Sequence, residues 1–573
     1  MSQMMHILRK DLRHLRWLLV LWALILITRV VLSAIGAGTA GATFPAMVVF
    51  RELSVVLSIV PALMMALLVS RLVHDEPLVG WNAFWLTRPY SSSALLSAKL
   101  LFLATVLVIA PLIADLVTMS IFHAGPRAQL AAAPSFLFGH LTWALAVCVV
   151  AALTPSLAAF VLAIIGSVVA LVVTILLLFS VAIAFAGEQT FTGDLSMLPD
   201  PTPGFVSLLV FVASALAVVI YQYRHRRWRI ALVLACAGLV ATVFLPGYWP
   251  WPFLRPQPPD PGQWARNTQA TQVTIDPRMA LNMSREVFDS AAPPRRRIHA
   301  FAVLTGTPPE FANRGVTVNG TLTLPDSTTV RSRQNDSFSR EWGSTEGLVL
   351  PDTETPAHAA LGDVTVLNDI EKQRYEQWPV MLSLTAEEHA RYKGQKGRFE
   401  ATLDFHMYRT RERGTLPLRD GSALDDGLSR IEVMRATPID GGYRLVVRYW
   451  HALPPKPTGN RPTYEFFLRN RPARAAVALR SVDSWSGSFS GQSVGGRVAS
   501  AVLPGFSIGS SPGGFDVQTQ VLEFPWRMQG GYVGVARLEP AWFDDAELVV
   551  LETAYAGTVT RSVNLPDFTI PEE

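Results

Sequence analysis

Seven apolar segments within the first 250 residues constrain the fold of this chain more than any other feature. An α-helix needs about 20 apolar residues, at a rise of about 1.5 Å per residue, to cross the hydrocarbon core of a bilayer. Of the 573 residues, 50% are hydrophobic, more than an ordinary soluble domain requires. The sequence therefore predicts a polytopic α-helical membrane domain, with spans at 17–36, 47–69, 95–122, 136–153, 156–186, 204–223 and 229–247.

The segment before the first span, residues 1–16, has a helical pattern of its own. Charged residues separate apolar residues at helical spacing, which are Met5, Leu8, Leu12 and Leu15. This pattern is typical of an amphipathic helix that lies in the membrane interface. The apolar run at 17–35 is longer than the apolar core of a secretory signal peptide, so we interpret it as a membrane span.

The distribution of charge predicts the topology. Lys and Arg gather in the cytoplasmic loops of membrane proteins. The N-terminal arm, the insert at 70–99 and the segment 224–229 are basic and fall on one side, whereas the loop with Glu188, Asp194 and Asp200 is acidic. We expect a multi-pass protein of a bacterial inner membrane, with a cytoplasmic N-terminus and a periplasmic C-terminal domain.

The basic excess belongs to the membrane half of the chain. Residues 1–255 contain 15 Lys and Arg against 8 Asp and Glu, and the remainder contains 34 against 37. The net charges are therefore +7 and −3. Because the C-terminal half lacks a basic excess, we do not expect nucleic acid as a partner.

The insert at 70–99 is a polar segment between two predicted spans. Asp75 suits an N-cap, Glu76 the positive end of a helix and Pro77 its first turn. The helix would end before Pro89, because proline disfavours a helical conformation in the preceding residue. Residues 91–93 then offer a new N-cap before the next span. The sequence thus predicts a short amphipathic helix on the cytoplasmic side.

Four residues of this insert, Glu76, Gly80, Pro89 and Lys99, resemble at this spacing the permease subunits of ABC-2 type transporters. The resemblance covers residues 1 to about 228. It implies a six-span core, dimerisation with a second permease subunit (a homodimer or heterodimer), and a coupling helix that docks on a separate ATPase. The coupling loop would contain Asp75, Glu76, Gly80, Trp81, Phe84, Trp85, Arg88, Pro89 and Lys99.

The insert departs from the family at two positions. A small polar residue often follows the glycine in the family, whereas this chain has Trp81. The family often has a basic residue shortly after the proline, whereas Arg88 precedes Pro89 here. The contacts with an ATPase would differ in detail.

The sequence contains no motif that would make the chain an enzyme. It has no P-loop, so ATP and Mg²⁺ would bind the partner ATPase, and we expect no cofactor on this chain. Residues 387–389 (Glu-Glu-His) lack the second histidine of a zinc-protease helix. Residues 491–495 match the letters of a nucleophile elbow but lie in a Ser/Gly-rich turn region. We expect neither catalysis nor a metal site.

Charged residues within the predicted spans form a second group of candidates. Charges inside a bilayer are costly, and they usually face a partner or a cavity. Arg29 and Asp115 fall in the outer halves of the first and third spans, so we expect that they can pair; Arg51 and Glu52 enter the second span at a similar level. The interpretations are an ion pair that fixes helix packing, charges that reach the lipid headgroups, or a polar gate on a transport path. The polar residues that we interpret as interface anchors are His140, Trp143 and Tyr221.

The C-terminal half differs from the membrane half in its sequence pattern. After the six-span core at 17–228, a seventh span at 229–247 would carry the chain outward, and a proline-rich linker follows at 248–263. Runs with period-two alternation then predict β-strands at 315–325, 399–408, 443–449 and 547–551.

These strands predict an all-β, sandwich-like soluble domain. Thr385 and Glu388 form a capping-box pattern, which predicts one short helix among the strands. More than 300 residues exceed one sandwich, so we expect two β modules, at 264–390 and 391–573.

Two functions are consistent with this organisation. The favoured one is the permease subunit of an ABC-2 type transporter, expected to be an exporter. The alternative is a membrane-tethered extracytoplasmic β domain that binds or senses envelope components, with the helices as anchor and relay. A single span would suffice as an anchor, and the insert would then have no role.

Overall fold

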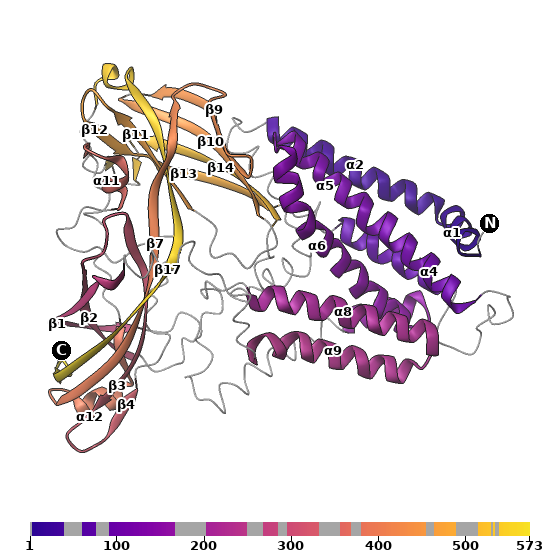
Figure 1. The fold of residues 1–573 in the computed structure, drawn as a ribbon, viewed down its shortest axis with the longest axis horizontal. Helices are drawn as coiled ribbons and strands as arrows, with labels where there is room; N and C mark the ends of the chain where they lie inside the picture. The colour runs from indigo at the N-terminus through magenta and orange to yellow at the C-terminus, as the bar shows by residue number, and fades with distance from the viewer. Residues whose placement is uncertain are drawn as a thin grey trace.

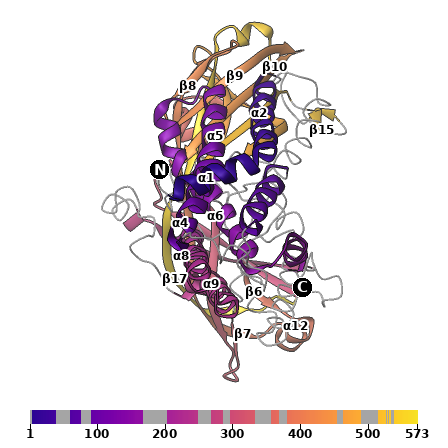
Figure 2. The ribbon, with the colours of Figure 1, turned by 90° about the vertical axis from the view of Figure 1, so that its right-hand side faces the viewer.

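The chain divides into a helical N-terminal part and a β-rich C-terminal part, which lie side by side (Figure 1). Figure 2 looks from the helical side and shows the β sheets behind the helices, extending beyond them at both ends. This computed structural model describes residues 3–38, 60–75, 91–166, 202–248, 268–284, 295–331, 356–367, 380–439, 441–453, 463–488, 514–525, 527–528, 531–532 and 538–572.

The helical part consists of long apolar helices preceded by one amphipathic helix. The helices are α1 (Gln3–His14), α2 (Arg16–Gly38), α4 (Ser92–Phe102), α5 (Ala110–Ile121), α6 (Pro126–Leu153), α8 (Thr202–His225) and α9 (Trp228–Tyr248). A π-helical segment, η2 (Leu103–Ile109), joins α4 and α5 into one continuous rod. The side chain of Ser91 accepts from the backbone N–H of Ala94, which confirms the N-cap predicted for this region.

Four helices within the described part of the chain are long and apolar enough to cross a membrane. They are Arg16–Ile35, Ser93–Ile121, Pro126–Leu153 and Leu208–His225. Three shorter apolar helices, Val60–His74, Leu157–Gly166 and Trp228–Thr242, overlap the remaining three predicted spans. The prediction of a membrane-type helical domain is therefore confirmed, and the count of seven spans stays a prediction.

The helices α6 and Leu157–Gly166 are separated by a true break at Thr154. Thr154 has an extended backbone conformation, and its N–H bonds to Ala151, which ends α6. The hydroxyl of Ser156 accepts from the N–H of Ala159 and begins the next helix. Because the backbone leaves the helical conformation at Thr154, this is a helix end and not a kink within one helix.

The last two helices, α8 and α9, pack closely along their length. A Cβ atom added to Gly238 of α9 would lie 2.6 Å from Cβ of Ser214 on α8, so only glycine permits this approach. Their short connection lies at the same end of the bundle as α1, the end far from the β sheets (Figure 1). The basic residues Arg224, Arg226, Arg227 and Arg229 gather there.

The β-rich part contains a seven-stranded sheet in the order β4-β3-β7-β17-β11-β12-β5, a five-stranded sheet in the order β13-β14-β10-β9-β8 and a three-stranded sheet in the order β1-β2-β6. All neighbours are antiparallel except β12 and β5. A two-stranded pair, β15 and β16, is separate. The bounds are β1 (Gln272–Ser284), β2 (Arg295–Thr305), β3 (Phe311–Thr323), β4 (Thr329–Arg331), β5 (Thr365–Val366), β6 (Val380–Leu384), β7 (Lys396–Pro417), β8 (Ala423–Asp425), β9 (Ser429–Ile439), β10 (Gly442–Leu453), β11 (Thr463–Asn470), β12 (Ala475–Ala478), β13 (Arg480–Ser488), β14 (Gly514–Phe524), β15 (Arg527–Met528), β16 (Gly531–Tyr532) and β17 (Ala546–Thr569).

The seven-stranded sheet supports two hydrophobic cores. One core lies between this sheet and the five-stranded sheet, with Leu468 and Val550 from one side and Val433 and Leu445 from the other. The second core lies between the opposite half of the seven-stranded sheet and the three-stranded sheet, around Phe399. Two packed layers with a shared apolar interior make this part sandwich-like.

The long strands β7 and β17 run through both cores (Figure 1). β3 pairs with β7 from Phe311↔Arg409 to Thr323↔Arg398. Strands from both sides of the boundary expected at 390/391 therefore belong to one sheet, so the two modules share their central strands. The short helix α12 (Ala386–Tyr392) has the predicted capping box between Thr385 and Glu388.

Candidate functional site

A buried ion pair joins three helical segments at the end of the bundle far from the β sheets. Nζ of Lys99 on α4 lies 2.9 Å from Oδ2 of Asp11 on α1 and donates to the carbonyl of Leu72, also at 2.9 Å. The side chains of Lys99 and Asp11 are 5% and 1% exposed. Burying two charges is tolerated when each finds a partner in good geometry. This pair therefore fixes α1 against the two helices on either side of residues 76–90.

Two further polar contacts lie near this pair. Nε2 of His14 lies 3.2 Å from Oδ2 of Asp75. Nε2 of His74 lies 3.1 Å from the carbonyl oxygen of Thr154, at the break after α6. We call Asp11, His14, His74, Asp75 and Lys99 the distal cluster, because it is far from the β sheets.

The distal cluster contains two of the residues predicted for the coupling loop. Asp75 follows the helix Val60–His74, and Lys99 lies within α4. Lys99, which the family resemblance assigns to the coupling loop, lies in the predicted span 95–122, and its buried side chain pairs with Asp11 of α1. The other predicted coupling residues, Glu76, Gly80, Trp81, Phe84, Trp85, Arg88 and Pro89, lie outside the described residues.

A second polar site lies toward the β sheets, within the apolar helices. Nη2 of Arg29 on α2 donates to Oδ1 of Asp115 on α5, so the predicted contact is present. Nε2 of His140 on α6 lies 2.6 Å from Oδ2 of the same carboxylate. The Asp115 side chain is 1% exposed, against 21% for Arg29 and 15% for His140. We call Arg29, Asp115 and His140 the proximal triad.

His140, which the sequence suggests is an interface anchor, contacts the Asp115 carboxylate instead. A signal was present in the predicted span limits. Asp115 lies seven residues before the end of the span 95–122, and His140 lies four residues after the start of the span 136–153. Both side chains are therefore at a similar depth on consecutive spans. Arg51 and Glu52, the other predicted intramembrane charges, lie outside the described residues.

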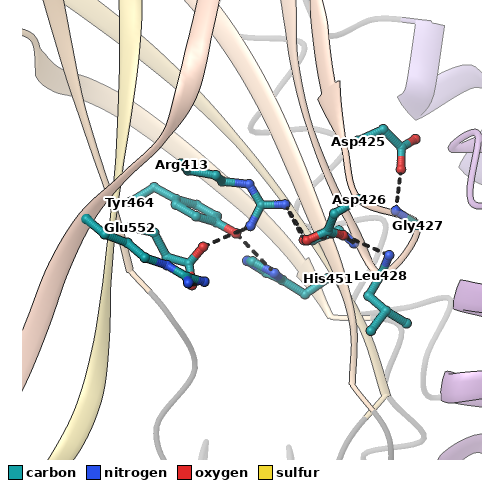
Figure 3. A network of polar contacts seen from close by, with 10 residues as sticks. Arg413, Asp425, Asp426, Gly427, Leu428, His451, Tyr464 and Glu552 are labelled. Atoms are coloured by element: carbon teal, nitrogen blue, oxygen red, sulfur yellow. Dashed lines mark hydrogen bonds and ion pairs between the residues drawn. The ribbon is translucent and has the colours of Figure 1, made fainter.

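A third polar network lies between the two larger sheets of the β-rich part (Figure 3). Arg413 on β7 donates to Glu552 on β17 at 3.0 Å and to Asp426, in the β8–β9 turn, at 2.8 Å. It also donates to the hydroxyl of Tyr464 on β11 at 3.0 Å. That hydroxyl lies 3.4 Å from Nδ1 of His451 on β10. The network ties together the two sheets and the turn.

The electrostatics of this network explain its stability. Burial acts to raise the pKa of Asp426, but the N–H groups of Leu428 and Ser429, together with Arg413, outweigh it and lower that pKa. Burial raises the pKa of Tyr464, and Glu552 adds to this effect while Arg413 opposes it. Arg413 thus pairs with both carboxylates, and Arg411 adds a second ion pair to Glu552 at 3.1 Å, so the network ties these strands together.

Comparison with known protein families and with curated proteins found no match for this chain.

Proposed function

We propose that this chain is the membrane-embedded permease subunit of an ABC-2 type transporter, powered by a separate ATPase that binds the coupling loop at 70–99, with residues 75–89 as the transmission element. The resemblance of Glu76, Gly80, Pro89 and Lys99 to that family supports the proposal. The helical part supports it as well, because several membrane-length helices exceed what an anchor needs. Export is the expected direction, with a second permease subunit completing the transport path.

The contact between Lys99 and Asp11 is the observation that carries this proposal furthest. Residues 76–90 connect the helix Val60–His74 to α4, and Lys99 joins both helices to α1 through Leu72 and Asp11. Rigid elements joined by buried contacts move together. A displacement imposed on residues 76–90 would then be passed to three helical segments at once, as a transmission element requires.

In this proposal the proximal triad has two possible roles. It is either a polar gate on the transport path or an ion pair that holds α2, α5 and α6 together. The carboxylate of Asp115 accepts hydrogen bonds from Arg29 on α2 and from His140 on α6. Separation of these helices would break both contacts. The triad would therefore resist opening at this end, which suits a gate.

A second candidate is a membrane-tethered β domain that senses an envelope component. The extensive packing of β10 and β14 on the ends of α5 and α6 favours it, because a relay needs such a contact. The two candidates differ in whether an ATPase binds the opposite end.

Purification of the full chain from its native membranes in mild detergent tests the proposal. We expect an ATPase with a P-loop to co-purify, identified by mass spectrometry, and ATP hydrolysis in that preparation to depend on the presence of this chain. A well-folded, monodisperse protein that binds no P-loop ATPase would favour the sensor.

A further inference from the structure

The helix α6 begins about three turns before the span predicted from the sequence, and this extension carries the main contact with the β-rich part. Ala128, Ala132 and Phe136 recur every four residues on one face of the helix and are 0% exposed. They form one cluster with Trp450 of β10 and Phe515 of β14. We call Ala128, Ala132 and Phe136 the docking face. Its two alanines allow the sheet to approach the helix closely.

The end of α5 is held by the same two strands. Phe122 is the residue at which α5 ends, and carbonyl groups at this position lack partners within the helix. Nε1 of Trp450 donates to the Phe122 carbonyl at 2.8 Å. The guanidinium of Arg448 lies 5.5 Å from the Phe122 ring centroid, and the rings of Phe122 and Phe515 are 6.2 Å apart. Strand β10 therefore completes the C-terminus of α5.

A third contact comes from the β8–β9 turn. A Cβ atom at Gly427 would lie 3.4 Å from Cδ of Arg127, in the first turn of α6. The neighbouring Asp426 accepts from the N–H groups of Leu428 and Ser429 and from Arg413 (Figure 3). The polar network between the sheets thus fixes the turn that touches α6.

The helices held in this way are the two that carry the carboxylate and the imidazole of the proximal triad. Asp115 lies seven residues before Phe122, about 10 Å along α5, and His140 lies four residues after Phe136, about 6 Å along α6. Helices are rigid over such lengths. Rotation or translation of either helix end changes the distance between Asp115 and His140.

We propose that the β-rich part is a positioning element for the proximal triad: by holding the ends of α5 and α6 through Trp450 and the docking face, it keeps Asp115 and His140 in contact. Movement of the β domain on the helices then opens or closes the triad. This coupling is independent of whether the chain is a permease or a sensor, because it concerns two parts of the same chain.

Distance measurements between spin labels on the full chain in detergent test this coupling. Leu130 on α6 and Ile113 on α5 are 75% and 55% exposed, so cysteines at these positions can be labelled and report the α5–α6 spacing. A second pair, at Leu130 and the exposed Arg419 between β7 and β8, reports docking of the β domain. The exposed Cys236 is replaced by serine, and Cys148 is buried.

Two variants disturb the contact in different ways. Trp450→Phe removes the hydrogen bond to Phe122 and keeps most of the ring. Ala132→Leu places a larger side chain in the docking face and forces the sheet away, which cores tolerate poorly. Trp542→Phe is the matched control, since Trp542 packs against the core between the two larger sheets.

We expect Trp450→Phe and Ala132→Leu to broaden or shift both distance distributions, and Trp542→Phe to leave both as in the wild type. If the β domain were attached to the helices without positioning the triad, the variants would change only the distance between the labels at Leu130 and Arg419. An unchanged α5–α6 spacing in both variants, whether or not the β domain undocks, would overturn the proposal.

Discussion

Arg29 on α2 donates a hydrogen bond to Asp115 on α5, although the two residues are 86 positions apart in the chain. Both lie in helices that are long and apolar enough to cross a membrane. A lone charge in such a helix is costly, and a partner on a neighbouring helix lowers that cost. The pair therefore specifies which helices pack together, and His140 adds a third helix to the same carboxylate.

Arg29→Leu and Asp115→Leu should each destabilise the helical part by about 3–5 kcal/mol, because each leaves a buried charge without its main partner. The double substitution should recover much of the loss, since it removes both charges. The measurement is the yield of monodisperse protein and its thermal midpoint in detergent. Strictly additive losses would show that the two side chains do not interact.

Lys99→Met should also destabilise the protein by about 3–5 kcal/mol, because it removes the ammonium group that pairs with the buried Asp11 carboxylate. Lys99→Met with Asp11→Leu should be closer to the wild type. Arg13→Met is the matched control, since Arg13 is an exposed cation on the same helix, α1. Thermal unfolding of the full chain in detergent measures the difference. Equal effects of Lys99→Met and Arg13→Met would contradict a structural role for the buried pair.

The sequence predicts most of the helical elements because span length and polar interruptions are local properties. The amphipathic helix at 1–16 corresponds to α1, and the Ser91 N-cap is present. The start of α6 was missed by ten residues. Residues 126–135 pack on β10 and β14 as well as on α5, and these contacts are not visible in the hydropathy of the segment itself. Contacts between parts distant in sequence decide such a boundary.

The β strands were predicted from their alternation, and the pairing was not. β7, β10 and β17 include three of the predicted runs, and β3 covers residues 315–323 of the fourth. Which strands share a sheet depends on long-range register, and the pattern of one strand does not encode its neighbour. The sharing of β7 and β17 by two cores is a property of this kind.

Asp426→Asn should make the stability of the chain less dependent on pH. The pKa of Asp426 is below its ordinary value of 3.8 in the folded protein, because backbone N–H groups and Arg413 outweigh the effect of burial. Such a carboxyl stabilises the fold above its unfolded pKa, and the contribution is lost as the pH falls through the lowered folded pKa.

The unfolding midpoint of the Asp426→Asn variant should therefore be lower than that of the wild type at about pH 7, and the difference should shrink at about pH 3. Denaturant unfolding of the full chain, followed by tryptophan fluorescence, measures it. Asp545→Asn, at an exposed turn, is the control. A constant difference between variant and wild type across this pH range would contradict the argument.

Reporter fusions test the proposed orientation of the two ends of the bundle. The α8–α9 connection and α1 lie at the end opposite the β sheets (Figure 1), and both are basic. A reporter after Glu573 should be exported, and one inserted at 226–227 should stay in the cytoplasm. A cytoplasmic reporter after Glu573 would contradict this orientation and would place the β-rich part beside the proposed ATPase.

Binding of the ATPase to a Trp85→Ala variant tests the central claim most directly. A large aromatic residue on a short helix often anchors a partner, and its truncation costs about 2 kcal/mol, or roughly 30-fold in affinity. Trp228→Ala is the matched control, since Trp228 is 45% exposed at the start of α9, at the same end of the bundle. We predict that Trp85→Ala weakens ATPase binding and lowers its stimulation, while Trp228→Ala does neither. Wild-type binding and stimulation in a well-folded Trp85→Ala protein would contradict the proposal that residues 75–89 are the coupling element.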